Sequence, residues 1–147
     1  MADAQYTELS IEQGAKKQHD SNYKPLYSDI DLSFAEHPNT SDLKKITGYV
    51  CIKQSMRNIL QTRKFERLGH PEIGSNLQDL LFDPMSIITE TRLKQSIENT
   101  MSTLEPRAII RDIQVTSEDD RNRYRVKIIF TMMGSQNSET FEQFLYR

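Results

Sequence analysis

MSTLEPRAIIRDIQV, residues 101–115, contains the change of pattern that decides the fold of this chain. Up to Leu104, apolar residues such as Leu93 and Ile97 recur at the spacing of one helix face. Pro106 lacks a backbone N–H and disfavours helical geometry in the residue before it, so we expect the helix to end at about Leu104. Beyond Pro106, apolar and polar residues alternate. The sequence therefore predicts an amphipathic helix followed by β-strands.

Glu105 and Arg107 stand on either side of Pro106, and we call these three residues the elbow. A carboxylate at a helix C-terminus faces the negative end of the helix dipole, which costs about 0.3–1 kcal/mol unless a cation compensates it. Either Arg107 supplies that cation as a local ion pair, or a partner protein supplies it. If the pair is exposed, replacing Arg107 by alanine should change stability by no more than about 1 kcal/mol.

Three strands are predicted after the elbow, over residues 109–115, 123–132 and 139–146, with polar turns at 117–122 and 134–137. The second strand has the clearest alternation. One set of its side chains is apolar (Tyr124, Val126, Ile128, Phe130 and Met132), and the other is mostly polar (Arg123, Arg125, Lys127 and Thr131). This pattern is typical of an antiparallel sheet with one face on a core and the other in water.

Strands and helices are also predicted before the elbow. Ile30, Leu32 and Phe34 alternate with polar residues, which predicts a half-buried strand over 28–34, and a short strand is expected over 43–46. Three helices are expected here. The first is capped by Thr47 and runs to about Thr62, and its inner face consists of Ile52, Met56, Ile59 and Leu60. A short helix follows over 76–82, and the helix that ends at the elbow begins with Asp83 as N-cap and Pro84 in its first turn.

The length of 147 residues suits one domain. The fold class that the elements predict is α+β: a single compact domain in which two main helices pack on a small, mostly antiparallel sheet formed largely by the C-terminal strands. Residues 1–24 are mostly polar and bury too little apolar surface to offset the entropy of ordering. We therefore expect a flexible N-terminal arm at 1–24 and the folded domain at 25–147.

Residue types that carry catalysis or bind metals are few and scattered. His19, His37 and His70 fall in the expected arm or in loops without helical i, i+4 pairing, so we expect no metal site and no cofactor. Cys51 lies among apolar residues, which indicates a buried side chain rather than a nucleophile. The sequence contains no glycine-rich phosphate loop and no G-x-S-x-G motif. We therefore expect no small-molecule substrate.

The charge pattern gives no reason to expect a nucleic-acid partner. The formal net charge is −2. Arginines gather around the first predicted hairpin (Arg107, Arg111, Arg121, Arg123 and Arg125), but the acidic run at 118–120 would neutralise them. No stretch approaches the roughly 18 apolar residues of a membrane span, and no secretory signal is visible, so we expect no membrane partner and synthesis in a cytoplasm.

Several stretches, taken in order, carry a family resemblance. They are 27-YSDIDLSF-34, 52-IKQSMRNILQT-62, 74-GSNL-77 with 80-LLF-82, and the elbow. Together they resemble the small baseplate wedge subunit of contractile-tailed phages, a family related to TssE of the type VI secretion baseplate. The family's Gly-Glu-Arg loop stands here as Phe65-Glu66-Arg67, without the glycine of the tight turn.

The resemblance implies assembly rather than enzymatic turnover. It implies that Glu105, Pro106 and Arg107 dock on the helical core bundle of the wedge scaffold proteins. It also implies that the tail sheath protein adds to the last strand by β-augmentation, at Phe141, Gln143 and Leu145. Tail-tube or hub-proximal proteins are further expected partners. The implied location is the virion tail baseplate, assembled in the host cytoplasm.

Two alternatives stand beside this interpretation. The same surfaces would serve a TssE-like or tailocin baseplate subunit of a bacterial contractile system. Some family members carry a lysozyme label, which raises the hypothesis of a peptidoglycan hydrolase. Phage-type muramidases place a catalytic Glu nine residues before an Asp, and no glutamate of this sequence has an aspartate at that offset. We therefore expect a structural protein and no catalytic residues.

Overall fold

The computed structural model describes residues 27–147, so the arm predicted at residues 1–24 lies outside the described residues. The elements in order are β1 (Ser28–Ile30), β2 (Lys45–Thr47), α2 (Tyr49–Gln61), α3 (Leu77–Leu81), α4 (Ile87–Leu104), β3 (Ala108–Glu118), the 3-10 turn η2 (Asp119–Arg121), β4 (Arg123–Met132) and β5 (Ser138–Tyr146). Helices and antiparallel strands are mixed as the sequence indicates, and the predicted α+β class is confirmed.

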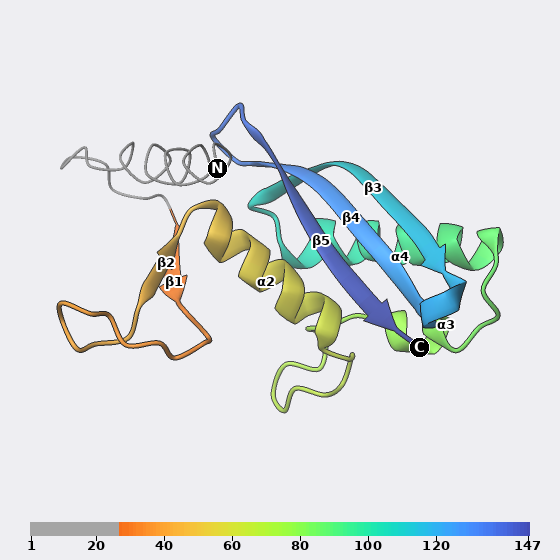
Figure 1. Cartoon of the computed structure of the whole chain (residues 1–147), viewed down its shortest axis with the longest axis horizontal. Coiled ribbons are helices and arrows are strands. Elements are labelled where there is room, and N and C mark those ends of the chain that lie inside the picture. The colour runs from red at the N-terminus through yellow and green to blue at the C-terminus, as the bar shows by residue number, and fades with distance from the viewer. Residues whose placement is uncertain (1–26) are drawn as a thin grey trace, which may run out of the picture.

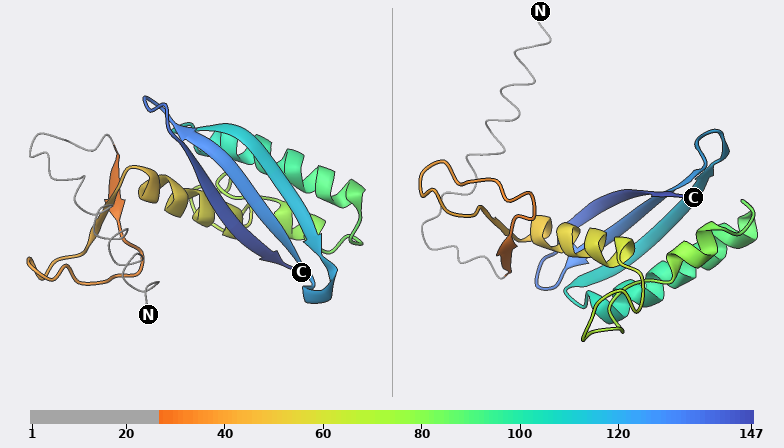
Figure 2. Two further views of the ribbon diagram at one scale, coloured as in Figure 1. Left: turned by 45° about the horizontal axis from the view of Figure 1, so that its top comes forward. Right: turned by 90° about the horizontal axis from the view of Figure 1, so that it is seen from below.

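The C-terminal strands form an antiparallel meander in the order β3-β4-β5. Both long helices, α2 and α4, lie on one face of this sheet (Figures 1 and 2). In the register, Ile128 of β4 stands opposite Ile113 of β3 and Phe141 of β5. A bulge between Ile110 and Asp112 interrupts the pairing of β3 with β4. The architecture is therefore one helical layer on one sheet.

The core lies between the sheet and the two long helices. It contains the whole apolar set predicted for β4 and the inner face predicted for α2, together with residues of α4: Tyr124, Val126, Ile128, Phe130, Met132, Ile52, Met56, Ile59, Leu60, Leu93, Ile97 and Met101 are all buried. The core face predicted for β4 is therefore confirmed, whereas Thr131, which was predicted on the face in water, is buried at 3% exposure.

Two helix starts differ from the prediction. Gly48, with φ of 60°, is the N-cap of α2, whereas Thr47 is the last residue of β2. A left-handed backbone at this junction is open to glycine at little cost. Ser86 rather than Asp83 caps α4, since its hydroxyl accepts a hydrogen bond from the Thr89 N–H. The predictions at Thr47 and Asp83 were therefore wrong by one and three residues.

The N-terminal strands form a separate two-stranded sheet, and we call residues 28–47 the ribbon. The ribbon projects from the N-terminal end of α2, away from the main sheet (Figure 1). The strand predicted over 28–34 is shorter than expected, because β1 ends at Ile30. Its apolar side chains do not reach a core: Ile30, Leu32 and Phe34 are 46, 49 and 68% exposed. Residues 27–147 therefore cover these side chains only in part.

Candidate functional site

The elbow is fixed between α4 and the sheet. α4 ends at Leu104, as predicted, and Glu105 is its C-cap. The Glu105 N–H donates to the Met101 carbonyl at 2.9 Å, which closes the last helical turn. On the other side, the Arg107 carbonyl accepts a hydrogen bond of 2.9 Å from the N–H of Met133, just after β4. Both charged residues of the elbow are therefore held by backbone contacts.

Glu105 and Arg107 form a bidentate ion pair. Arg107 Nε donates to Glu105 Oε1 at 2.5 Å, and Arg107 Nη2 donates to Oε2 at 2.6 Å. The Glu105 side chain is only 1% exposed, whereas that of Arg107 is 30% exposed. The local ion pair, one of the two interpretations left open by the sequence, is thus present in the chain. Only its cationic half reaches the surface.

Two distant residues complete the surroundings of Arg107. Arg107 Nη1 lies 3.7 Å from the sulfur of Cys51, and the guanidinium carbon lies 5.4 Å from the centre of the Tyr27 ring. Sequence reasoning did not connect either residue with the elbow, because no local pattern links positions so far apart. Cys51 is fully buried, as predicted, and this burial raises the pKa of its thiol.

Arg107 keeps free donors for a partner. A guanidinium carries five N–H groups, and the contacts with Glu105 and Cys51 use three of them. The two that remain have no acceptor among residues 27–147. The hydrogen bonds with Glu105 raise the pKa of Arg107 above its ordinary value, so the side chain stays cationic.

The residues predicted for sheath binding lie on β5, which is an edge strand of the main sheet. An edge position leaves one row of backbone donors and acceptors without a partner strand. Phe141 and Leu145, however, are buried in the core, and Gln143 is half-buried. Their side chains face the helices. A strand added at this edge would therefore meet the backbone of β5 and not these side chains.

The loop between α2 and α3 contains Phe65-Glu66-Arg67. Phe65 has φ of 68°, the left-handed conformation that glycine adopts most readily. The tight turn is thus retained without glycine. Glu66 supports it, because its carboxylate accepts a hydrogen bond of 2.8 Å from the N–H of Arg63. Buried Ser75 closes the loop through a 2.8 Å bond from its N–H to the Thr62 carbonyl.

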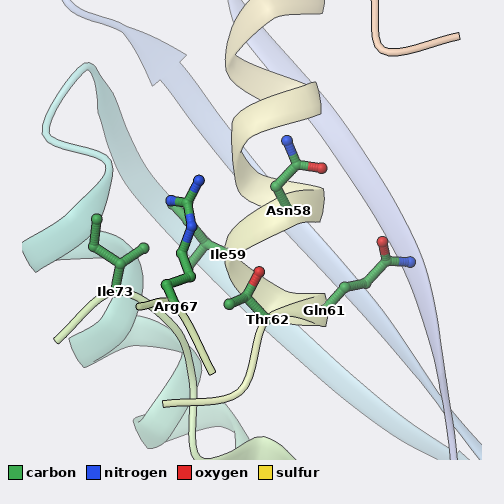
Figure 3. A pocket seen from close by; sticks show the side chains of 6 residues that line it. All are labelled: Asn58, Ile59, Gln61, Thr62, Arg67 and Ile73. Atoms are coloured by element: carbon green, nitrogen blue, oxygen red, sulfur yellow. The ribbon is translucent and has the colours of Figure 1, made fainter. Parts of the chain in front are cut away.

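A hollow of about 270 Å³ lies between the C-terminal end of α2 and this loop (Figure 3). It is lined by Asn58, Ile59, Gln61, Thr62, Arg67 and Ile73. Arg67 is the charged member of the lining, so the hollow offers no carboxylate or imidazole for acid–base chemistry. Among residues 27–147, no three His, Cys, Asp or Glu side chains gather as metal ligands. No helix in the same range is both long and apolar enough to cross a membrane.

Known proteins are similar to this chain in sequence and in fold. Residues 49–137 match the family described as baseplate wedge protein gp25. Baseplate wedge protein gp25 of Enterobacteria phage T4 is 32% identical over 123 residues, which cover 84% of this chain and 91% of the T4 protein. A putative tail lysozyme from Geobacter sulfurreducens superposes with a TM-score of 0.61 at 21% identity, over 65% of this chain and 86% of the other. A chain of the anti-feeding prophage baseplate superposes with a TM-score of 0.65 at 20% identity, over 76% of this chain and 89% of the other. At such identities these two structures share the fold alone.

Proposed function

This chain belongs to the family of baseplate wedge protein gp25, and from that premise we propose that it is a structural component of a contractile-tail baseplate wedge, docked on the helical core bundle of the wedge scaffold through Arg107. The elbow carries this proposal because its position is fixed and Arg107 has two N–H groups without an acceptor among residues 27–147. The same chain would receive the tail sheath protein at the edge of β5.

The observation that supports docking is that Glu105 is buried and holds Arg107, whereas Arg107 reaches the surface. The buried Glu105 carboxylate holds two of the Arg107 N–H groups and so fixes the plane of the guanidinium. A guanidinium held in one orientation loses little conformational entropy on binding. Its outer edge can donate hydrogen bonds to a carboxylate or to a pair of carbonyl oxygens. We therefore expect the scaffold to contribute acidic side chains or helix C-terminal carbonyls to this contact.

The support for sheath binding is the position of β5. It is an edge strand with exposed outward side chains at Thr140 and Glu142. An extended arm of a sheath subunit could continue the sheet by backbone pairing, with specificity from these outward residues. Phe141 and Leu145 would contribute indirectly, by anchoring β5 to the core. Gln143 is half-buried and would lie beneath the added strand.

We propose no enzymatic role. The curated relative is a wedge protein, and the hollow beside α2 has no acid–base pair. A second candidate is the equivalent subunit of a tailocin or TssE-like apparatus, favoured by the likeness of the fold to the anti-feeding prophage baseplate chain. Both candidates use the same surfaces, and tail-tube or hub-proximal proteins would be additional neighbours in either assembly.

Co-purification with the cognate scaffold proteins tests the elbow. The variant Glu105→Ala/Arg107→Ala removes the pair, and Asp83→Ala/Arg92→Ala is a matched control that removes an exposed ion pair with a 3.7 Å separation elsewhere. We expect the wild type and the control to enter the scaffold complex and the elbow variant to be lost from it. Normal entry of the elbow variant, with an intact melting transition, would refute docking through Arg107. Binding to sheath protein alone should be unaffected by either variant.

A further inference from the structure

The ribbon exposes more apolar surface than its own fold explains. Ile30, Leu32, Phe34 and Leu43 are all exposed, and Ile46 is the buried hydrophobic residue of the ribbon. A two-stranded sheet on its own is at best marginally stable in water, and it usually needs a surface to pack against. Residues 27–147 cover this side of the ribbon only in part, and they leave 41% of Leu43, 46% of Ile30, 49% of Leu32 and 68% of Phe34 exposed.

The ribbon is nevertheless held in a defined position. Gln54 of α2 bridges two backbone groups of the ribbon: its Nε2 donates to the Ile30 carbonyl at 2.9 Å, and its Oε1 accepts from the Leu32 N–H at 3.2 Å. The Gly48 N–H also donates to the carbonyl of Tyr27. These contacts occupy the free backbone edge beside Ile30, so a binding partner would meet side chains there. A surface fixed in advance loses less entropy on binding.

Phe34 adds a second and independent observation. Its φ is 53°, a left-handed conformation that costs energy for a residue with a Cβ. The Phe34 N–H closes a turn by donating to the Asp31 carbonyl at 3.1 Å, but its ring is 68% exposed and gains little packing within residues 27–147. Strained backbone that holds a side chain out of the fold tends to mark functional sites.

The charges around these side chains indicate the chemistry of the partner. The ribbon contains four carboxylates (Asp29, Asp31, Glu36 and Asp42) against two lysines (Lys44 and Lys45). Among the described residues, Asp31 alone of the four has a cationic partner, Lys44 at 3.9 Å. The ribbon therefore carries a net negative charge, which attracts a basic partner and repels anionic lipid headgroups or nucleic acids.

We propose that the ribbon is a docking surface, separate from the Arg107 contact, for a protein segment whose apolar side chains are flanked by lysine or arginine. Leu32 and Phe34 supply its exposed apolar side chains, and the carboxylates of the ribbon supply its net negative charge. This surface goes beyond the elbow and β5 contacts, because it needs neither the free N–H groups of Arg107 nor the sheet edge.

Calorimetric titration of the full chain with two synthetic amphipathic helices of equal length tests the proposal. One helix consists of leucine and lysine, and the other of leucine and glutamate. We expect the lysine helix to bind at least about tenfold more tightly, with a difference that shrinks as salt is added. Equal binding of the two peptides, or tighter binding of the glutamate helix, would overturn the proposal.

Two pairs of variants locate the surface. Leu32→Ser/Phe34→Ser should weaken binding of the lysine helix at least about tenfold, whereas Ile87→Ser/Ile88→Ser, at an exposed apolar pair on α4, should not. Equal losses in both would show unspecific adhesion and reject the site. If Leu32→Ser/Phe34→Ser lowers the melting temperature, a second variant tests the charge instead. Asp29→Asn/Asp42→Asn should reduce the ratio of the affinities for the lysine and glutamate helices. Glu105→Ala/Arg107→Ala should bind the lysine helix like the wild type, which separates this site from the elbow.

Discussion

Arg107 donates two hydrogen bonds to a Glu105 carboxylate that is almost completely buried, although the two residues are separated only by Pro106. The partners differ in exposure, 1% for Glu105 and 30% for Arg107. A buried carboxylate is tolerated when it is paired and hydrogen-bonded. The same ion pair therefore contributes to the stability of the fold on one side and offers a cation to a partner on the other.

Arg107→Ala should destabilise the protein more than the double variant Glu105→Ala/Arg107→Ala, which removes both charges. The single variant leaves the Glu105 carboxylate buried without its cation, which costs about 3–5 kcal/mol. Glu105→Ala/Arg107→Ala leaves no unpaired charge and should lose less. Denaturant unfolding at neutral pH measures both free energies of unfolding. A single variant within about 1 kcal/mol of the wild type would restore the sequence-based expectation of an exposed pair.

Phe130→Ala tests the register of β4. Phe130 is fully buried between the sheet and the helices, so truncation should lower the free energy of unfolding by about 3–5 kcal/mol. Phe82→Ala is the matched control, because the Phe82 ring is exposed and its loss should cost no more than about 0.5 kcal/mol. Similar melting temperatures for the two variants would contradict the observed packing.

The main sheet and the long helices could be predicted because their signals are periodic. In β4, alternation over ten residues identified both the strand and its buried face. The end of α4 at Leu104 followed from the local chemistry of Pro106. Signals of this kind need no knowledge of the rest of the fold. Helix starts were less predictable, because Ser86 and Asp83 are both suitable caps and packing selects between them.

For the elbow, the sequence could predict which residues take part but not how they are arranged in space. The sequence indicated that Glu105 and Arg107 could pair, but their exposure depends on the tertiary packing around the elbow. Contacts of Arg107 with Tyr27 and Cys51 arise from tertiary packing, which has no local signature. The ribbon differs again, because its alternation predicted a buried face that residues 27–147 provide only in part. Such a mismatch between pattern and fold is expected where a partner completes the structure.

Gly74→Ala should be more destabilising than Gly134→Ala. Both glycines have positive φ, 136° and 84°. A Cβ at Gly74 would lie 2.7 Å from the carbonyl oxygen of Arg63, whereas a Cβ at Gly134 meets nothing within 4 Å. Gly134→Ala should therefore cost about 1–2 kcal/mol for its conformation alone, and Gly74→Ala should cost more because backbone must shift. Thermal unfolding ranks the two variants, and the reverse order would show that the 63–75 loop yields easily.

Glu118 should make the stability of the protein depend on pH in the acid range. Its carboxylate accepts hydrogen bonds from Arg123 Nε at 2.7 Å and Arg125 Nε at 2.9 Å. The bond from Arg123 is the main reason that the pKa of Glu118 is lowered from its ordinary 4.5. The folded state therefore binds a proton less readily than the unfolded state. The stabilisation is present above pH 4.5 and is lost as the pH falls through the lower pKa of the folded state.

Glu118→Gln should accordingly be less stable than the wild type at pH 7, and the difference should shrink as the pH is lowered below about 4.5. Asp120→Asn serves as the control, because Asp120 has no ion pair among the described residues. Unfolding free energies measured at several pH values between 7 and 3 give the comparison. A Glu118→Gln variant as stable as the wild type at pH 7 would instead show that Arg123 holds the hairpin through Phe144, over which its guanidinium lies at 3.9 Å. A difference that stays constant over this range would contradict a role for the ionised carboxylate.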